Sequence, residues 1–267
     1  MSQYSGYEAI KQAFGLARGE GRAALIPFFT AGYPTLSVLA DLIRAAEEAG
    51  ADLVEIGIPF SDPLADGPVL QRAAGEALAA GVTIDQIFSA LSRLPVGAPR
   101  IFLTYVNPVL RRGYAGFAHQ AADVGMAGAV VPDLPWVESG ALSREFDKRQ
   151  LALVPLVAPT STSQHLRNIS TSKGFIYGVS VTGVTGSRSG IDVGVTNMVQ
   201  RIKAMTDLPV AIGFGISTPE HARAIGEIAD GVIVGSALTE ALMAEQGNLA
   251  KTAYEFLRPM RKALDHV

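Results

Sequence analysis

Short runs rich in β-branched and aromatic residues alternate with longer helical patterns along the whole chain. Between the runs, residues 35–50 and 218–229 are typical of helices: Thr35 and Thr218 can cap their N-termini, Pro219 suits a first helical position, and Gly50 suits a helix end. The short runs predict eight strands, at residues 24–30, 52–58, 101–106, 128–133, 151–157, 174–180, 209–215 and 230–236.

Eight strands, each followed by a helical segment, predict an α/β protein with a single (β/α)₈ TIM barrel, in one domain over residues 1–267. A doubly wound open sheet is the structural alternative, but it needs only five or six strands. Two helical stretches fall outside the eightfold count. We expect residues 6–18 to form an extra N-terminal helix across the bottom of the barrel, and residues 83–94 to form an extra helix after the second barrel helix.

Composition narrows the class of protein. The 267 residues are 48% hydrophobic, with no apolar run of transmembrane length and no N-terminal signal-peptide pattern. A net charge of −3 gives no indication of a basic surface that would bind nucleic acid. Cysteine is absent, which excludes disulfides and thiolate metal sites and fits a cytoplasmic protein. We expect no metal site, since the histidines lack ligand spacing: His119, His165, His221 and His266.

Glu55 stands inside the apolar second strand run. Strand alternation places Val54, Ile56 and Ile58 on one face and Glu55 on the other. The branched apolar set suits the layer under the helices, so we expect Glu55 to point into the barrel near its C-terminal end. Burial there raises a carboxyl pKa and suits a proton carrier. A purely structural glutamate is the alternative, but the neighbouring strand runs contain no Arg or Lys to pair with it.

The segment after this strand, "PFSDPLADGP" at residues 59–68, contains three prolines that restrict the backbone. A stiff loop lowers the entropy cost of holding Asp62 and Asp66 over the barrel mouth. Divalent ions usually recruit more oxygen ligands or histidine, so a metal site is not favoured. Turn chemistry explains each aspartate equally well, and the residues alone leave that choice open.

Two glycine-containing loops indicate a phosphate site. "GFGIS" at residues 213–217 follows the seventh strand and "VGSAL" at residues 234–238 follows the eighth, where barrels frequently bind phosphate. The long polar loop at residues 181–194, with four glycines, suits a lid that closes over a ligand; a disordered connector is the alternative. Together these features predict a site for a phosphorylated small molecule.

The chain closely resembles the tryptophan synthase alpha chain family over nearly its whole length. The resemblance rests on "LIPFFTAGYP" (25–34), "LVEIGIPFSDPLADGPVLQRA" (53–73), "VVPDLP" (130–135), "SVTGVTG" (180–186), "GFGIS" and "VGSA". It implies a (β/α)₈ lyase that cleaves indole-3-glycerol phosphate to indole and glyceraldehyde 3-phosphate. It also implies an α₂β₂ complex with a beta chain, which holds pyridoxal phosphate and takes up the indole; this chain itself needs no cofactor.

The resemblance assigns roles residue by residue. Glu55 matches the general acid–base, which protonates indole C3 and then removes the glycerol hydroxyl proton. Asp66 matches the second catalytic carboxylate, which stabilises positive charge on the ring. The substrate-binding matches are Phe28, Leu103, Tyr105, Tyr177 and Thr185, and the phosphate-binding matches are Gly186, Phe214, Gly215, Gly235 and Ser236. Val181 and Trp136–Val137 depart from residues common in the family, in the lid and at the expected partner-facing rim.

Other functions stay open at this point. The first alternative is another barrel enzyme that acts on a phosphosugar, such as an isomerase or indole-glycerol-phosphate synthase. That synthase needs catalytic lysines at strand ends, and no predicted strand contains Lys. A non-catalytic barrel that activates its partner is a second, although it need not keep a buried acid. A stand-alone lyase that releases free indole is a third.

Overall fold

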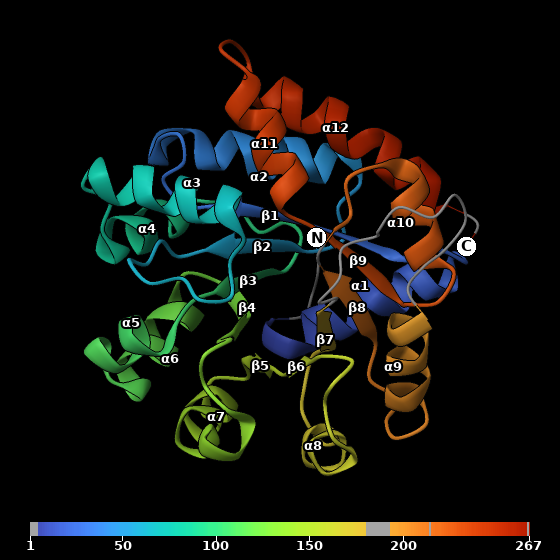
Figure 1. The fold of residues 1–267 in the computed structure, drawn as a ribbon. Coiled ribbons are helices and arrows are strands. Elements are labelled where there is room, and N and C mark those ends of the chain that lie inside the picture. Colours follow the sequence, from blue (N-terminus) through green and yellow to red (C-terminus); the bar gives the residue numbers. More distant parts are fainter. Residues whose placement is uncertain (1–4, 180–192, 214, 266) are drawn as a thin grey trace.

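One parallel sheet forms the centre of the molecule and curls into a barrel surrounded by helices (Figure 1). The computed structural model describes residues 5–179, 193–213, 215–265 and 267. Around the sheet the strand order is β5-β4-β3-β2-β1-β9-β8-β7-β6. The strands are β1 (Ala24–Thr30), β2 (Val54–Gly57), β3 (Arg100–Leu103), β4 (Met126–Val130), β5 (Ala152–Val154), β6 (Leu156–Val157), β7 (Ile176–Val179), β8 (Val210–Gly213) and β9 (Gly231–Val234). The predicted TIM barrel is confirmed.

The fifth predicted strand, residues 151–157, is wrong as a single strand. It divides at Pro155 into β5, which pairs with β4, and β6, which pairs with β7. Proline has no N–H to donate to a strand ladder, and its carbonyl instead accepts the N–H of Tyr177 at 2.9 Å. The chain therefore changes neighbours at Pro155, which joins the two edges of the sheet.

Helices form the outer layer around the sheet (Figure 1). Their apolar faces cover the outward side chains of the strands. Val54, Ile56 and Ile58 lie in this outer core, as alternation along the second strand predicts. The helices are α1 (Gly6–Gly19), α2 (Leu39–Ala49), α3 (Pro68–Ala79), α4 (Ile84–Leu91), α5 (Val106–Arg112), α6 (Tyr114–Asp123), α7 (Gly140–Lys148), α8 (Ser163–Ile169), α9 (Val193–Lys203), α10 (Pro219–Gly226), α11 (Ser236–Ala244) and α12 (Leu249–Leu264), with 3₁₀ turns η1 (Leu36–Val38) and η2 (Trp136–Glu138). No helix in these described ranges is long and apolar enough to cross a membrane.

Both extra helices are present. Helix α1 buries Ile10 and Phe14 against inward side chains of the barrel such as Ile26 and Leu53, which confirms that it covers the bottom. Helix α4 is the predicted extra helix after α3, and its N-terminus carries a capping box between Thr83 and Gln86.

The predicted helix at residues 35–50 begins later than its sequence suggests. Residues 36–38 form the 3₁₀ turn η1, and α2 starts only at Leu39. Thr35 makes no cap because its hydroxyl bonds that of Ser37 at 2.9 Å. Gly50 ends α2 in the left-handed region, with φ of 98°, and Thr218 caps α10 by accepting the N–H of His221, both as predicted.

Candidate active site

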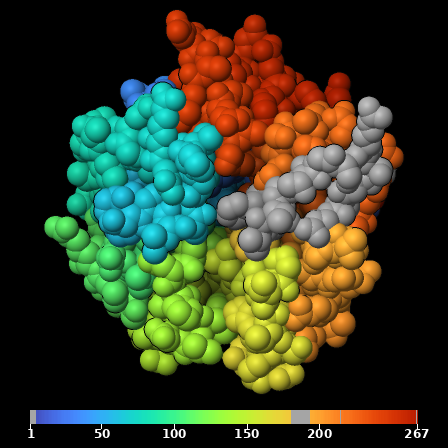
Figure 2. All heavy atoms as spheres, viewed as in Figure 1, coloured from blue at the N-terminus to red at the C-terminus, as the bar shows by residue number. Residues whose placement is uncertain are grey.

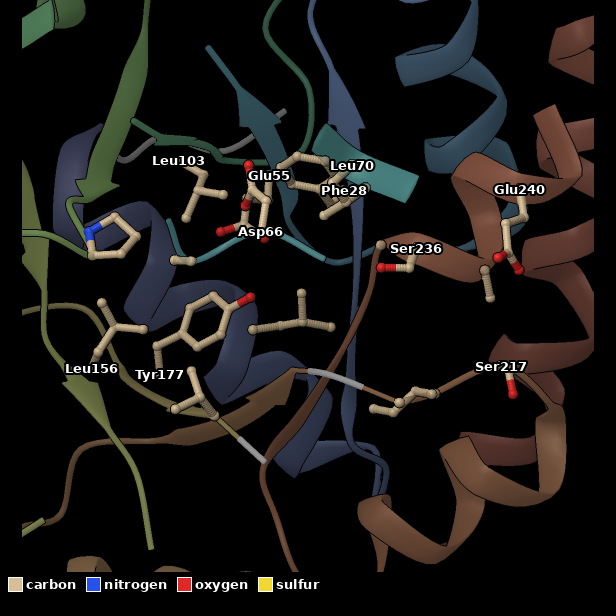
Figure 3. A pocket seen from close by; sticks show the side chains of 18 residues that line it. Phe28, Glu55, Asp66, Leu70, Leu103, Leu156, Tyr177, Ser217, Ser236 and Glu240 are labelled. Atoms are coloured by element: carbon tan, nitrogen blue, oxygen red, sulfur yellow. The ribbon is translucent and has the colours of Figure 1, made fainter. Parts of the chain in front are cut away.

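A cavity of about 230 Å³ opens at the C-terminal ends of the strands, the end where TIM barrels place their active sites. Figure 2 shows the face of the molecule onto which these loops emerge, with the helices arranged around it. Figure 3 shows that the side chains around the cavity come from many different strands and loops. The lining residues are Phe28, Glu55, Ala65, Asp66, Leu70, Leu103, Pro132, Leu156, Tyr177, Val179, Gly215, Ile216, Ser217, Ile233, Gly235, Ser236, Ala237 and Glu240.

Glu55 lies inside the barrel, as predicted, and only 1% of its surface is exposed. Its Oε1 atom has no hydrogen-bond partner among the described residues. Strand β3 starts one residue before the predicted run, so an arginine, Arg100, does belong to the neighbouring strand. Arg100 lies opposite Val54, however, and no described ion pair involves Glu55. Glu55 is therefore a buried acid without a cationic partner.

The environment of Glu55 favours its protonated form. Burial, and to a smaller extent the charge of Asp66, raise the pKa of this carboxyl to about 8, although a hydrogen bond with Tyr177 opposes the shift. Figure 3 shows the carboxyl groups of Glu55 and Asp66 near each other, with the Tyr177 hydroxyl directed toward them. At neutral pH this geometry holds a proton on Glu55.

Asp66 is less deeply buried than Glu55 and titrates at lower pH. Burial raises its pKa to about 6, and a hydrogen bond with Tyr105 opposes the shift. At pH 7 Asp66 is therefore mostly ionised while Glu55 is mostly protonated. Two neighbouring carboxyls with separated pKa values are a typical acid and charge-stabilising pair.

Tyr105 anchors the loop that holds Asp66. Its hydroxyl accepts the N–H of Ala65 at 3.2 Å and also hydrogen-bonds Asp66. Its ring stacks on Phe60, with 5.3 Å between the ring centroids. Asp62 instead accepts the hydroxyl of Ser61 at 2.6 Å on the exposed side.

Two strand glycines leave room for the aromatic rings of the site. A Cβ at Gly57 would lie 2.4 Å from the ring of Phe28, and a Cβ at Gly213 would lie 2.7 Å from the hydroxyl of Tyr177. Any larger side chain would displace these rings. Both glycines therefore determine where the aromatic walls of the cavity stand.

The opposite end of the cavity is formed by the start of α11. Its N-cap is Gly235 and its first residue is Ser236, and no side chain caps this helix end. The first backbone N–H groups of a helix have no partner within it and favour an anion. Gly215 lines the same end with φ of 77°, a conformation that suits glycine.

The cavity brings together most of the predicted site residues: Phe28, Glu55, Asp66, Leu103, Tyr177, Gly215, Gly235 and Ser236. Tyr105 does not line the cavity; it lies behind the loop and contacts Ala65 and Asp66. Thr185, Gly186, Phe214 and most of the predicted lid (181–194), namely residues 181–192, lie outside the described residues. The last two positions of the predicted lid, 193 and 194, instead begin helix α9.

Several lining residues had no place in the sequence prediction. Leu156 lies opposite Tyr177 in the strand register, and Val179 is two residues beyond it on the same inward face. Alternation along those strands was the signal that could have found them. Glu240 lines the cavity from the exposed first turns of α11.

Among the described residues, no group of three or more acidic or histidine side chains could hold a metal ion.

Comparisons with known proteins agree with this geometry. The family model described as "Tryptophan synthase alpha chain" matches residues 14–265. A tryptophan synthase alpha chain from Synechococcus elongatus is 46% identical over 261 residues, covering 96% of this chain and 97% of that protein. One from a Thermoanaerobacter species is 44% identical over 233 residues, covering 86% and 89%.

Solved structures match the fold as well. Tryptophan synthase subunit alpha from Legionella pneumophila superposes with a TM-score of 0.89 at 32% identity, covering 97% of this chain and 99% of that one. A chain of Mycobacterium tuberculosis tryptophan synthase superposes with a TM-score of 0.88 at 35% identity, covering 96% and 98%. Sequence and structure together show that this chain belongs to the tryptophan synthase alpha chain family.

Proposed function

We propose that Glu55 carries the proton and Asp66 stabilises the ring charge when this cavity cleaves indole-3-glycerol phosphate. As a family member, the chain is a carbon–carbon lyase of tryptophan biosynthesis that forms indole and glyceraldehyde 3-phosphate. The observation that supports the two roles is the pair of neighbouring carboxyls, buried Glu55 and partly buried Asp66, with pKa values near 8 and 6.

The proposed steps conserve protons. Protonated Glu55 donates to indole C3, and the ring becomes an electron acceptor with positive charge at its nitrogen. Ionised Asp66 stabilises that charge. The glycerol hydroxyl next to the ring then loses its proton to the Glu55 carboxylate, the C–C bond breaks, and its electron pair restores the neutral indole. Glu55 ends the cycle protonated, as it began.

The rest of the cavity suits the two ends of this substrate. Phe28, Leu103, Leu156 and Tyr177 provide apolar and aromatic walls of the kind that bury a flat ring. We place the phosphate against the N-terminus of α11, where backbone N–H groups and the helix dipole favour a dianion. Thr185, Gly186 and Phe214 stay predictions as further contacts.

A beta-chain partner follows from family membership. We propose that it docks at the barrel mouth in an α₂β₂ complex and holds the pyridoxal phosphate. Two exposed apolar side chains, Leu64 and Val137, support a protein partner at the loops of this end. A cytoplasmic location stays a prediction.

The test of the proposed function is release of indole from indole-3-glycerol phosphate, with and without added beta chain. Slow cleavage alone and faster cleavage with the beta chain are the expected results. Equal and fast release in both conditions would identify a stand-alone lyase. No release in either condition would identify a non-catalytic barrel.

The pH dependence of cleavage should reflect the carboxyl pair. We expect kcat/KM to fall below about pH 6, where Asp66 gains a proton, and above about pH 8, where Glu55 loses one. The two apparent values belong to the coupled pair. The substrate phosphate also titrates near pH 6, so binding of glycerol phosphate over the same range is the control. A rate that stays level as pH rises through 8 to 9 would contradict the role of Glu55.

Replacing Tyr105 with phenylalanine should move one side of this profile. The change removes the hydroxyl that lowers the pKa of Asp66 but keeps the ring that stacks on Phe60. We expect the acidic limb to shift to higher pH while the basic limb stays, as measured by the pH profile of kcat/KM. Tyr114→Phe, on α6 and away from the cavity, is the control. A uniform fall at every pH would mean that Tyr105 only supports the fold.

A further inference from the structure

A second cavity lies at the N-terminal end of the barrel, away from the catalytic site. Its volume is about 370 Å³, and it is bounded by the start of α1, the starts of β3 and β4, and the end of α7. None of the described residues that line it is acidic, and two are arginines, Arg100 and Arg149. We propose that this cavity binds a small phosphate-type oxyanion.

Arg100 provides the main observation. Only 5% of it is exposed, its Nε has no hydrogen-bond partner among the described residues, and its Nη2 donates one long bond, 3.4 Å, to the carbonyl of Pro95. Burial lowers the pKa of this guanidinium. A buried charge is costly unless an opposite charge and hydrogen bonds compensate it. The Nε atom itself is covered by protein, so an oxyanion in the cavity would compensate the charge of the guanidinium group as a whole.

No described carboxylate already does so at close range. Glu47 is the acidic residue that interacts electrostatically with Arg100, but the two form no ion pair within 4.0 Å. The Glu47 carboxylate accepts the N–H of Ala98 at 2.9 Å, and it lines a neighbouring cavity rather than this one. The charge of Arg100 is therefore not paired at close range by any described carboxylate.

Two further features add positive potential. Arg149 is exposed and lies just after α7, at the rim of the cavity. The 14-residue helix α1 begins at the cavity, and its N-cap Ser5 makes no side-chain cap, although the N–H of Tyr7 already donates to Gln150. A guanidinium offers paired donors that match phosphate oxygens, and a helix start favours the same charge.

Binding here would connect four elements that close the bottom of the barrel: α1, β3, β4 and α7. A ligand that binds only the folded state raises stability by mass action. The cavity lies at the barrel end where TIM-barrel enzymes place no chemistry. We therefore expect an effect on stability, with no direct effect on cleavage.

The experiment titrates the full chain with inorganic phosphate at constant ionic strength and follows the arginine Nε–Hε resonances by NMR. This readout separates the new site from the catalytic cavity, which contains no arginine among its described lining residues. The resonance of Arg100, assigned with Arg100→Lys, should shift and saturate. Glycerol phosphate and acetate, titrated in the same way, distinguish a phosphate ester or a carboxylate as the preferred form.

Arg149→Gln keeps the proposal testable even where Arg100→Lys destabilises the fold. It should weaken phosphate binding about tenfold, since one charge-assisted contact is lost, and leave indole-3-glycerol phosphate cleavage unchanged. The matched control is Arg144→Gln, the same charge change at an exposed position inside α7 that does not line the cavity. An Arg100 resonance that does not move at millimolar phosphate overturns the proposal. Equal weakening by both glutamine variants does so too.

Discussion

Replacing Glu55 with glutamine is expected to reduce cleavage by about 10²-fold or more while substrate still binds. Glutamine keeps the size of the side chain and can still bond Tyr177, but it has no proton to give to the indole ring. The measurements are the single-turnover rate of indole release and the affinity of a non-cleavable substrate analogue. Near-normal cleavage by the variant would contradict the proposed role of Glu55.

Stability against pH provides the control for this variant. The folded-state pKa of Glu55, about 8, lies above the ordinary value of a glutamate side chain, 4.5. Between these values the folded chain holds a proton that the unfolded chain has lost, so the free energy of unfolding falls as pH rises through this window. The Glu55→Gln variant does not lose stability in this way, because glutamine does not titrate. Thermal unfolding should therefore show the variant gaining stability relative to the parent from pH 4.5 to 8, whereas a constant difference would mean that Glu55 ionises normally.

The sequence was sufficient where a feature depends on neighbouring residues. Alternation along β2 is a local property, and it correctly placed Glu55 inside and Val54, Ile56 and Ile58 outside. The order of short and long segments likewise predicted the barrel and both extra helices. The helix caps Thr218 and Gly50 could be predicted because each acts only on the adjacent turn of its own helix.

Features that depend on distant residues could not be predicted in the same way. The hydroxyl of Tyr105 bonds Ala65, 40 positions earlier, so its place behind the loop follows from the packing of two strands. The strand divides at Pro155 because the residues before it pair with β4 and the residues after it pair with β7. The partnerless Nε of Arg100 depends on everything that surrounds the start of β3. These features depend on the tertiary structure, so the pattern of apolar residues in the sequence does not predict them.

The phosphate end of the cavity gives the second large expected effect, for Gly235→Asp. A Cβ at Gly235 would meet only Phe28, at an ordinary 3.5 Å, so the substitution fits the fold. Gly215 is less suitable because its φ of 77° would strain any larger residue. The backbone of Gly235, with φ of −119° and ψ of −79°, is not the extended one of a typical N-cap, so we expect no gain from capping and a start of α11 that remains intact. The carboxylate at this position would repel the phosphate.

Two like charges about 4 Å apart near a protein surface repel by about 4 kcal/mol, which corresponds to a loss of affinity on the order of 10²- to 10³-fold. We therefore expect glycerol phosphate to lose its thermal protection of Gly235→Asp, while the unliganded variant unfolds near the temperature of the parent. Gly235→Asn is the matched control, because it has nearly the same shape without the charge. The asparagine variant should lose much less affinity than the aspartate variant. Equal losses would attribute the effect to shape alone, and undiminished protection of the aspartate variant would place the phosphate away from the start of α11.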